Sequence, residues 1–161
     1  MNLIYLQLGS NLGDRKNLLD SAISLINKKI GRVSRRSKIY ESDAWGVSHQ
    51  PKYLNQILEV YSDIKCKYII NHIHSIESQL GRIRDKKWQE RLIDIDVIFF
   101  NDLIIEKNDL YIPHKYMHKR RFVLEPLNEL IGDYIHPKYK KSIAQLLNEC
   151  RDNQTVIEYE L

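Results

Sequence analysis

The chain has 161 residues, the size of one ordinary domain, and its hydrophobic fraction of 43% and charged fraction of 29% are close to globular averages. These values exclude a disordered chain, a collagen and a coiled coil, and no apolar run approaches the roughly 20 residues of a membrane helix. The N-terminus lacks a signal-peptide pattern and the two cysteines are isolated, so we expect a reduced, cytoplasmic protein. The net charge of +4 is modest and would suit either nucleic acid or a small polyanion such as a nucleotide.

The first third of the chain predicts one helix among three strands. Residues 2–8 are a short apolar run bounded by a glycine, which indicates a buried strand. Apolar residues then recur at helical spacing over 18–26, in a helix that ends at a glycine. Residues 33–40 alternate as in a strand, residues 41–52 form a loop punctuated by glycine and proline, and residues 53–61 are the next strand.

The remainder of the chain predicts a second helix, a long strand, a hairpin and short helices. Apolar residues at intervals of 4, 3 and 4 over 69–80 indicate an amphipathic helix. A basic loop over 82–91 leads into residues 92–100, which carry the strongest strand pattern of the chain. Residues 103–112 predict a hairpin, and apolar residues within 143–147 indicate a short helix near the end.

The predicted elements follow the order strand–helix–strand–strand–helix–strand. This order is the ferredoxin-like arrangement, so the sequence predicts an α+β protein. No repeat, low-complexity stretch or linker rich in proline and glycine interrupts the chain. We therefore expect a single domain over residues 1–161.

Two aspartates interrupt the apolar strand at 92–100. A period of two places Asp94 and Asp96 on one face with Cα atoms about 6.6–6.8 Å apart. Their charges then repel by about 2–2.5 kcal/mol at an effective dielectric of about 20. Such a pair suits Mg²⁺, which prefers one or two carboxylates plus substrate phosphates. The alternative is the solvated face of an edge strand, but apolar residues fill the opposite face and favour the metal site.

A basic loop lies directly before these aspartates. From Arg82 to Arg91, five cations flank Trp88. Guanidinium groups match phosphate oxygens bidentately, and arginines beside a transferred phosphoryl group can contribute roughly 10³–10⁵ in rate. Most basic runs are solvated surface loops, but the adjacency to the carboxylates favours polyphosphate chemistry here.

Two weaker clusters could complete such a site. Residues 113–122 contain two histidines, two lysines and two arginines, which could hold further phosphates, although a surface loop is the simpler explanation. Trp45 and Asn55 offer an aromatic face and an amide, which is how a flat heterocycle is held, whereas a loop tryptophan is more often a lid on the core. The sequence contains no Walker-type phosphate loop and no protein-kinase motif set.

Five motifs in a fixed order carry a resemblance to a known family. They are Leu8-Gly9-Ser10-Asn11-Leu12-Gly13-Asp14-Arg15, Gln50-Pro51-x-Tyr53-Leu54-Asn55, Glu77-x-x-Leu80-Gly81-Arg82-x-Arg84, Trp88-x-x-Arg91-x-x-Asp94-x-Asp96, and Pro113-His114 followed by Arg120-x-Phe122-Val123-Leu124. Over residues 2–137 the chain resembles the 6-hydroxymethyl-7,8-dihydropterin pyrophosphokinases of folate biosynthesis.

The resemblance implies an ATP-dependent enzyme. Members transfer pyrophosphate from ATP to the hydroxymethyl oxygen of the pterin and release AMP, in a ferredoxin-like α/β/α sandwich with a mainly antiparallel sheet. By the same resemblance, Asp94 and Asp96 hold two Mg²⁺ ions, and ATP and the pterin are the partners. We expect a monomer that binds neither nucleic acid nor membrane.

The resemblance also assigns residues to each substrate. Arg82 and Arg84 act in catalysis together with the two aspartates. The residues implied on the ATP side are Glu77, Arg82, Arg84, Trp88, Arg91, His114 and Arg120. Those implied for the pterin are Ser42, Asp43, Ala44, Trp45, Tyr53, Asn55 and Phe122, with the ring between Trp45 and Phe122.

Two departures from the family pattern and three rival interpretations accompany this assignment. Gln89-Glu90 stand where many members carry Gly-Pro, and Lys115 stands where proline or tyrosine is frequent, so we expect activity with a change in ATP affinity.

A nucleic-acid-binding ferredoxin-like module would leave the two aspartates unexplained. A two-metal nucleotidyltransferase would have no use for the pocket predicted for the pterin, and the intact catalytic motifs argue against an inactive relative.

Overall fold

The computed structural model describes residues 1–82 and 92–161. In chain order the elements are β1 (Asn2–Ser10), α1 (Arg15–Lys29), β2 (Arg32–Arg36), β3 (Tyr40–Ser42), β4 (Tyr53–Ser62), the 3-10 turn η1 (Cys66–Tyr68), α2 (Ile69–Gln79), β5 (Asp94–Phe100), β6 (Ile105–Lys107), β7 (Leu110–Ile112), the 3-10 turn η2 (Met117–Lys119), α3 (Arg121–Ile131), α4 (Ile143–Glu149) and β8 (Val156–Glu158). The hairpin predicted over 103–112 is confirmed by β6 and β7, which pair with each other.

The main sheet is antiparallel throughout its described pairs. Its strand order is β5-β1-β4-β3-β8, and β2 also pairs with β4. The long strands β1 and β4 form the centre, and β5 lies at one edge. This order is the one expected when the predicted succession of strands and helices folds in the ferredoxin-like way.

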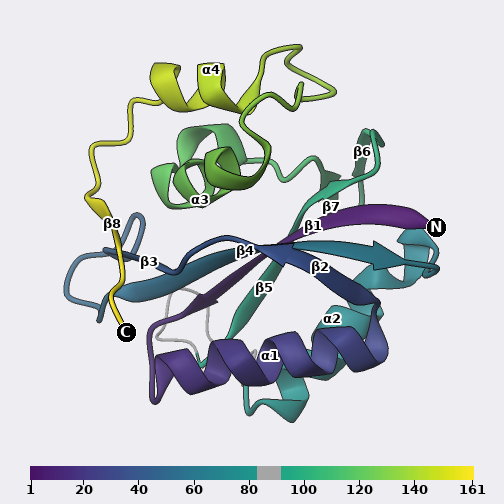
Figure 1. The fold of residues 1–161 in the computed structure, drawn as a ribbon, viewed down its shortest axis with the longest axis horizontal. Helices are drawn as coiled ribbons and strands as arrows, with labels where there is room; N and C mark the ends of the chain where they lie inside the picture. The colour runs from purple at the N-terminus through teal and green to yellow at the C-terminus, as the bar shows by residue number, and fades with distance from the viewer. Residues whose placement is uncertain (83–91) are drawn as a thin grey trace.

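Helices cover both faces of this sheet (Figure 1). Helices α1 and α2 pack on one face, over a core that includes Leu6 and Ile95, and α3 and α4 pack on the other, over Ile57 and Phe99. The buried stripe of α1 follows helical spacing, and the Asp14 side chain begins the helix by accepting a hydrogen bond from the backbone N–H of Asn17 (3.1 Å). The prediction of a ferredoxin-like α/β/α sandwich is thus confirmed.

The structure corrects the prediction of one strand over 33–40. The strand breaks after β2, because the Ser37 hydroxyl accepts a hydrogen bond from the Ile57 N–H (3.0 Å) and the Lys38 N–H turns to the carboxylate of Glu129 on α3 (3.1 Å). Pairing with β4 resumes in β3, which takes in residues 41 and 42 that the sequence had placed in a loop. Strand β8 was not predicted, since three residues carry too little pattern to indicate a strand.

No helix in the described ranges, 1–82 and 92–161, is both long enough and apolar enough to cross a bilayer.

Candidate active site

Strand pairing brings five residues to one face of the sheet: four belong to the motifs of the sequence, and the fifth, Gln7, directly precedes the first motif. Gly9 on β1 lies opposite Asn55 on β4 and Asp94 on β5, and Gln7 lies opposite Asp96. Residues opposite each other or two apart along a strand share a face. These five residues therefore lie on the side of the sheet that α3 covers, near the start of that helix, where Gln7 Nε2 donates to the Phe122 carbonyl (3.4 Å).

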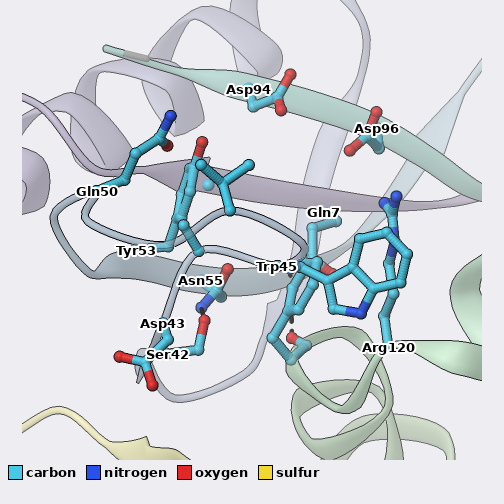
Figure 2. Close-up of a pocket in the computed structure, with 14 residues that line it drawn as sticks. Gln7, Ser42, Asp43, Trp45, Gln50, Tyr53, Asn55, Asp94, Asp96 and Arg120 are labelled. Carbon is cyan, nitrogen blue, oxygen red and sulfur yellow. Dashed lines mark hydrogen bonds between the residues drawn. The ribbon is translucent and has the colours of Figure 1, made fainter. Parts of the chain in front are cut away.

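A cavity of about 420 Å³ opens over this part of the sheet (Figure 2). It is lined by Gln7, Gly9, Ser42, Asp43, Ala44, Trp45, Val47, Gln50, Tyr53, Asn55, Asp94, Asp96, Arg120 and Phe122. All seven residues assigned to the pterin by resemblance are among them. The walls come from the segment after β3 and from the start of α3, which are far apart in the sequence and meet above the sheet.

A second cavity, of about 630 Å³, lies on the other side of the two aspartates. It is lined by Ile70, Ile73, His74, Glu77, Arg82, Asp94, Ile95, Asp96, Val97, Asp109, Leu110, Tyr111, His114, Lys115 and Tyr116. Three residues assigned to ATP by resemblance (Glu77, Arg82 and His114) are in this set. Asp94 and Asp96 line both cavities and thus form the boundary between them.

The two aspartates have the chemistry of an incomplete magnesium site. Both carboxylates are half-buried and lie side by side on β5 (Figure 2). No group of three or more potential metal ligands occurs among residues 1–82 and 92–161. Mg²⁺ accepts one or two carboxylates when substrate phosphates supply the other oxygens, so the residues present fit a metal that arrives with a nucleotide.

Arg82 lies against these carboxylates. Its Nη1 is 2.8 Å from Asp94 Oδ1, and it also forms an ion pair with Glu77, whose side chain is 2% exposed. The guanidinium group thus bridges an acid on α2 and an acid on β5, and it neutralises charge at the boundary of the two cavities. Its position in the second cavity is where a phosphate contact would be made.

His114 is held as a neutral hydrogen-bond donor. Burial, reinforced by the nearby positive charge of Arg120, lowers the pKa of His114 to about 4, while Asp94 opposes the change. Its Nδ1 accepts a hydrogen bond from the backbone N–H of Tyr116 (3.2 Å), which leaves the Nε2 position to carry the proton. The neutral ring can donate that proton to an oxygen in the second cavity.

Asn55 forms a fixed part of the floor of the first cavity. The side chain is 1% exposed, and its Nδ2 donates to Ser42 Oγ (2.8 Å) and to the Tyr40 carbonyl (3.2 Å), as Figure 2 shows for Ser42. With the donor side of the amide engaged in this way, Oδ1 is directed toward Gly9. The floor therefore presents a rigid acceptor to a ligand N–H.

Arg120 lies on the aromatic wall of the first cavity. Its guanidinium carbon is 4.6 Å from the centre of the Trp45 ring and 5.8 Å from that of Phe122. The resemblance assigns Arg120 to ATP, but in this structure it lines the cavity of the pterin candidates. The Trp45 face thus already accepts a planar group.

Some predicted residues lie outside the described ranges, and some lining residues were not predicted. Arg84, Trp88 and Arg91 belong to the undescribed segment 83–91. Sequence analysis did not identify Gln7, Gln50, His74 or Tyr116 as site residues, among others. Gln7 carried a usable signal, because it is the one amide within the apolar stretch 3–8, which continues into the first motif.

Comparison with known proteins supports the motif-based prediction. Residues 5–132 match the model of the family described as 7,8-dihydro-6-hydroxymethylpterin-pyrophosphokinase (HPPK). A relative from Aquifex aeolicus, named 2-amino-4-hydroxy-6-hydroxymethyldihydropteridine pyrophosphokinase, is 34% identical over 92% of this chain and 92% of its own length. A relative of the same name from Bacillus subtilis is 37% identical over 80% of this chain and 78% of its own length.

The fold is similar to that of a solved enzyme. The wild-type HPPK-DHPS of Plasmodium falciparum, crystallised with SDX-DHP, superposes with a TM-score of 0.77 at 19% identity, over 92% of this chain and 44% of that one. This chain thus spans less than half of that two-part protein. The sequence matches confirm the prediction made from the five motifs: the chain belongs to the 7,8-dihydro-6-hydroxymethylpterin-pyrophosphokinase (HPPK) family.

Proposed function

We propose that the two cavities hold the two substrates of one reaction and that Asp94 and Asp96 act at the point where these substrates meet. As a family member, the chain transfers pyrophosphate from ATP to the hydroxymethyl group of 6-hydroxymethyl-7,8-dihydropterin, leaving AMP, in folate biosynthesis. The single observation that carries the proposal is that both aspartates line both cavities.

The first cavity suits the pterin. Its volume of about 420 Å³ is in the range of small-molecule sites, and its apolar walls include Trp45 and Phe122. The pterin ring lies between these two aromatic side chains in the proposal, where the Arg120 guanidinium now stacks on Trp45. Asn55 Oδ1 accepts a hydrogen bond from the polar edge of the ring. The backbone at residues 42–44 and the Tyr53 ring close the pocket.

The second cavity suits the triphosphate of ATP. His114 donates a hydrogen bond as a neutral imidazole, and Arg82 contributes a positive charge next to the aspartates. The buried Glu77 holds Arg82 through their ion pair. Arg84, Trp88 and Arg91 complete the ATP-binding set by resemblance and stay a prediction.

Asp94 and Asp96 would hold magnesium, two ions in our proposal. Held by these carboxylates, magnesium would supply charge neutralisation for the phosphates and alignment of the reacting oxygens. The contribution of the chain itself is alignment: the rigid floor of β1, β4 and β5 fixes the pterin on one side of the carboxylates and the phosphates on the other. Transfer of this kind needs positioning and charge neutralisation more than covalent participation by the protein.

The remaining expectations concern the whole molecule. We propose that residues 1–161 act as one monomeric domain in the cytoplasm. Cys66 and Cys150 are both free thiols in the structure, which is consistent with a reducing compartment.

Product identification tests the proposal. The protein is incubated with ATP, Mg²⁺ and 6-hydroxymethyl-7,8-dihydropterin, and the products are identified by mass spectrometry. AMP and the pterin diphosphate are expected from wild type and from Asp63→Ala, an exposed aspartate outside both cavities, but not from Asp96→Ala. Formation of ADP, or AMP formation that continues in Asp96→Ala, would refute the assigned role of the aspartates.

A further inference from the structure

The C-terminal segment, residues 150–161, connects the helical layer with the edge of the sheet. It leaves α4, passes α3 and reaches β3, with which β8 pairs (Figure 1). We name this segment the C-terminal strap. It lies beyond residues 5–132, which match the family model, yet it contacts both elements that carry walls of the 420 Å³ cavity.

At one end the strap holds the start of α3. Arg121 is the first residue of α3 and lies between Arg120 and Phe122, which both line the cavity. The Arg121 backbone N–H donates to Asp152 Oδ2 and its Nε donates to the Asp152 carbonyl, each at 3.0 Å. The N-cap residue of α3 makes no capping hydrogen bond with its own side chain. Asp152 therefore supplies the carboxylate that a helix N-terminus favours.

Two residues further on, the strap holds the opposite wall. Gln154 Nε2 donates to the carbonyl of Ala44 (3.2 Å), the residue directly before Trp45. The Gln154 backbone N–H donates to Asp152 Oδ1 (3.0 Å). One carboxylate thus binds the start of α3 through Oδ2 and, through Oδ1, the residue that binds the Trp45 segment.

We propose that the C-terminal strap sets the gap between Trp45 and Phe122, with Asp152 and Gln154 as positioning residues for the pterin. The inference rests on the proposed function, in which the pterin ring lies between these two side chains. A gap that is held before binding removes the cost of ordering a loop around the ligand. Neither Asp152 nor Gln154 lines the second cavity, so the strap affects the pterin and not ATP.

Three variants test this assignment. Gln154→Ala removes the donor to Ala44, Asp152→Ala removes both carboxylate contacts, and Asn153→Ala, at an exposed position between them, is the matched control. Dissociation constants for 6-hydroxymethylpterin and for a non-hydrolysable ATP analogue with Mg²⁺ are measured by titration calorimetry, and KM is measured for both substrates. The two strap variants are expected to weaken pterin binding by about 3–10-fold, the effect of one or two lost hydrogen bonds.

The binding of the ATP analogue is expected to stay within twofold of wild type in all variants, and Asn153→Ala is expected to behave as wild type. Because Asp152 and Gln154 act in one chain of hydrogen bonds, the double variant is expected to lose little more than either single variant. Melting temperatures are recorded in parallel. Gln154→Ala leaves the cap of α3 in place and carries the test if Asp152→Ala does not fold.

The outcomes separate this inference from the function on which it rests. Unchanged pterin affinity in Gln154→Ala would overturn the role of the strap while the wild-type activity stood. An equal loss of pterin and ATP-analogue binding would also overturn it, because it would indicate a general loss of structure. Wild-type protein that bound no pterin would overturn the proposed function and, with it, the inference.

Discussion

Replacement of Glu59 by glutamine tests how the sheet holds the helical layer that carries one wall of the site. Glu59 is buried on β4, and its Oε1 accepts hydrogen bonds from Ser34 Oγ (2.7 Å) and Arg35 Nε (3.1 Å). Its Oε2 accepts from the Tyr5 hydroxyl (2.9 Å) and pairs with Arg35 Nη2. Arg35 in turn donates to the Leu130 carbonyl near the end of α3 (3.2 Å). The carboxylate thus organises a link between the sheet and α3.

The magnitude follows from the pKa of this carboxyl. Hydrogen bonding to Arg35 outweighs the effect of burial and lowers the pKa of Glu59 from 4.5 to about 2. At 1.36 kcal/mol per pKa unit, the ionised form is stabilised by about 3 kcal/mol in the folded protein. Because the Arg35 side chain is 50% exposed and solvent screens the pair, we expect about 1.5–3 kcal/mol to be lost in Glu59→Gln. Since the folded pKa is the lower one, this stability is present above pH 4.5 and disappears as the pH falls toward 2.

Urea unfolding followed by circular dichroism at pH 7, 4 and 3 measures the effect. Wild type is expected to lose stability between pH 4.5 and 2, and Glu59→Gln is expected to be less stable at pH 7 and to lose less on acidification. Glu158→Gln is the matched control, because Glu158 forms an exposed ion pair with Lys38 and should change stability little. If the free energy of unfolding fell by the same amount between pH 7 and pH 3 in Glu59→Gln and in wild type, the acid-sensitive stability would not come from Glu59.

Three further predictions concern the site and its frame. Asp96→Ala is expected to abolish AMP formation while urea unfolding shows equal or greater stability, because one of two neighbouring carboxylates is removed; an active variant would contradict the metal assignment. The His114 imidazole is expected to stay neutral from pH 8 to about 5 in an NMR titration. Because its pKa is lower in the folded than in the unfolded protein, the free energy of unfolding is expected to fall as the pH drops from 6.5 toward 4. An NMR titration midpoint of His114 near 6.5 would contradict its burial. Gly31→Ala places a Cβ 2.2 Å from the Tyr61 carbonyl oxygen, and a loss of about 1–3 kcal/mol in urea unfolding is expected without a change in pterin affinity; unchanged stability would show that the contact relaxes freely.

The parts of the site that were predicted from the residues alone are those fixed by local geometry. Asp94 and Asp96 share a face because a strand has a period of two, and this holds whatever lies beside the strand. The order of helices and strands was likewise predicted from patterns within each segment. The second cavity also contains Arg82, which was predicted from its adjacency to the aspartates in the sequence.

The parts that could not be derived from the residues depend on contacts between distant segments. Trp45 and Phe122 form one pocket because the segment after β3 and the start of α3 meet above β1, and only the resemblance predicted this pairing. The ion pairs of Arg82 with Glu77 and Asp94, and the stacking of Arg120 on Trp45, depend on side-chain positions that spacing does not determine. The break at residues 37–39 has the same origin, because Glu129 competes for the Lys38 N–H across the fold.

The position of the site can nevertheless be traced in the three strands of the floor. Under α3 the sheet face carries the core residues Tyr5 on β1 and Ile57 on β4, and the buried carboxylate of Glu59 beside them is bonded to Tyr5 and Arg35. One step along, on the same face, β1 presents Gln7, β4 presents Asn55 and β5 presents Asp96. Three adjacent strands thus change from a largely apolar to a polar lining near the start of α3. A buried polar residue on one strand is commonly an isolated exception, whereas such a change across several paired strands marks the edge of the core, where a ligand can replace the missing helix.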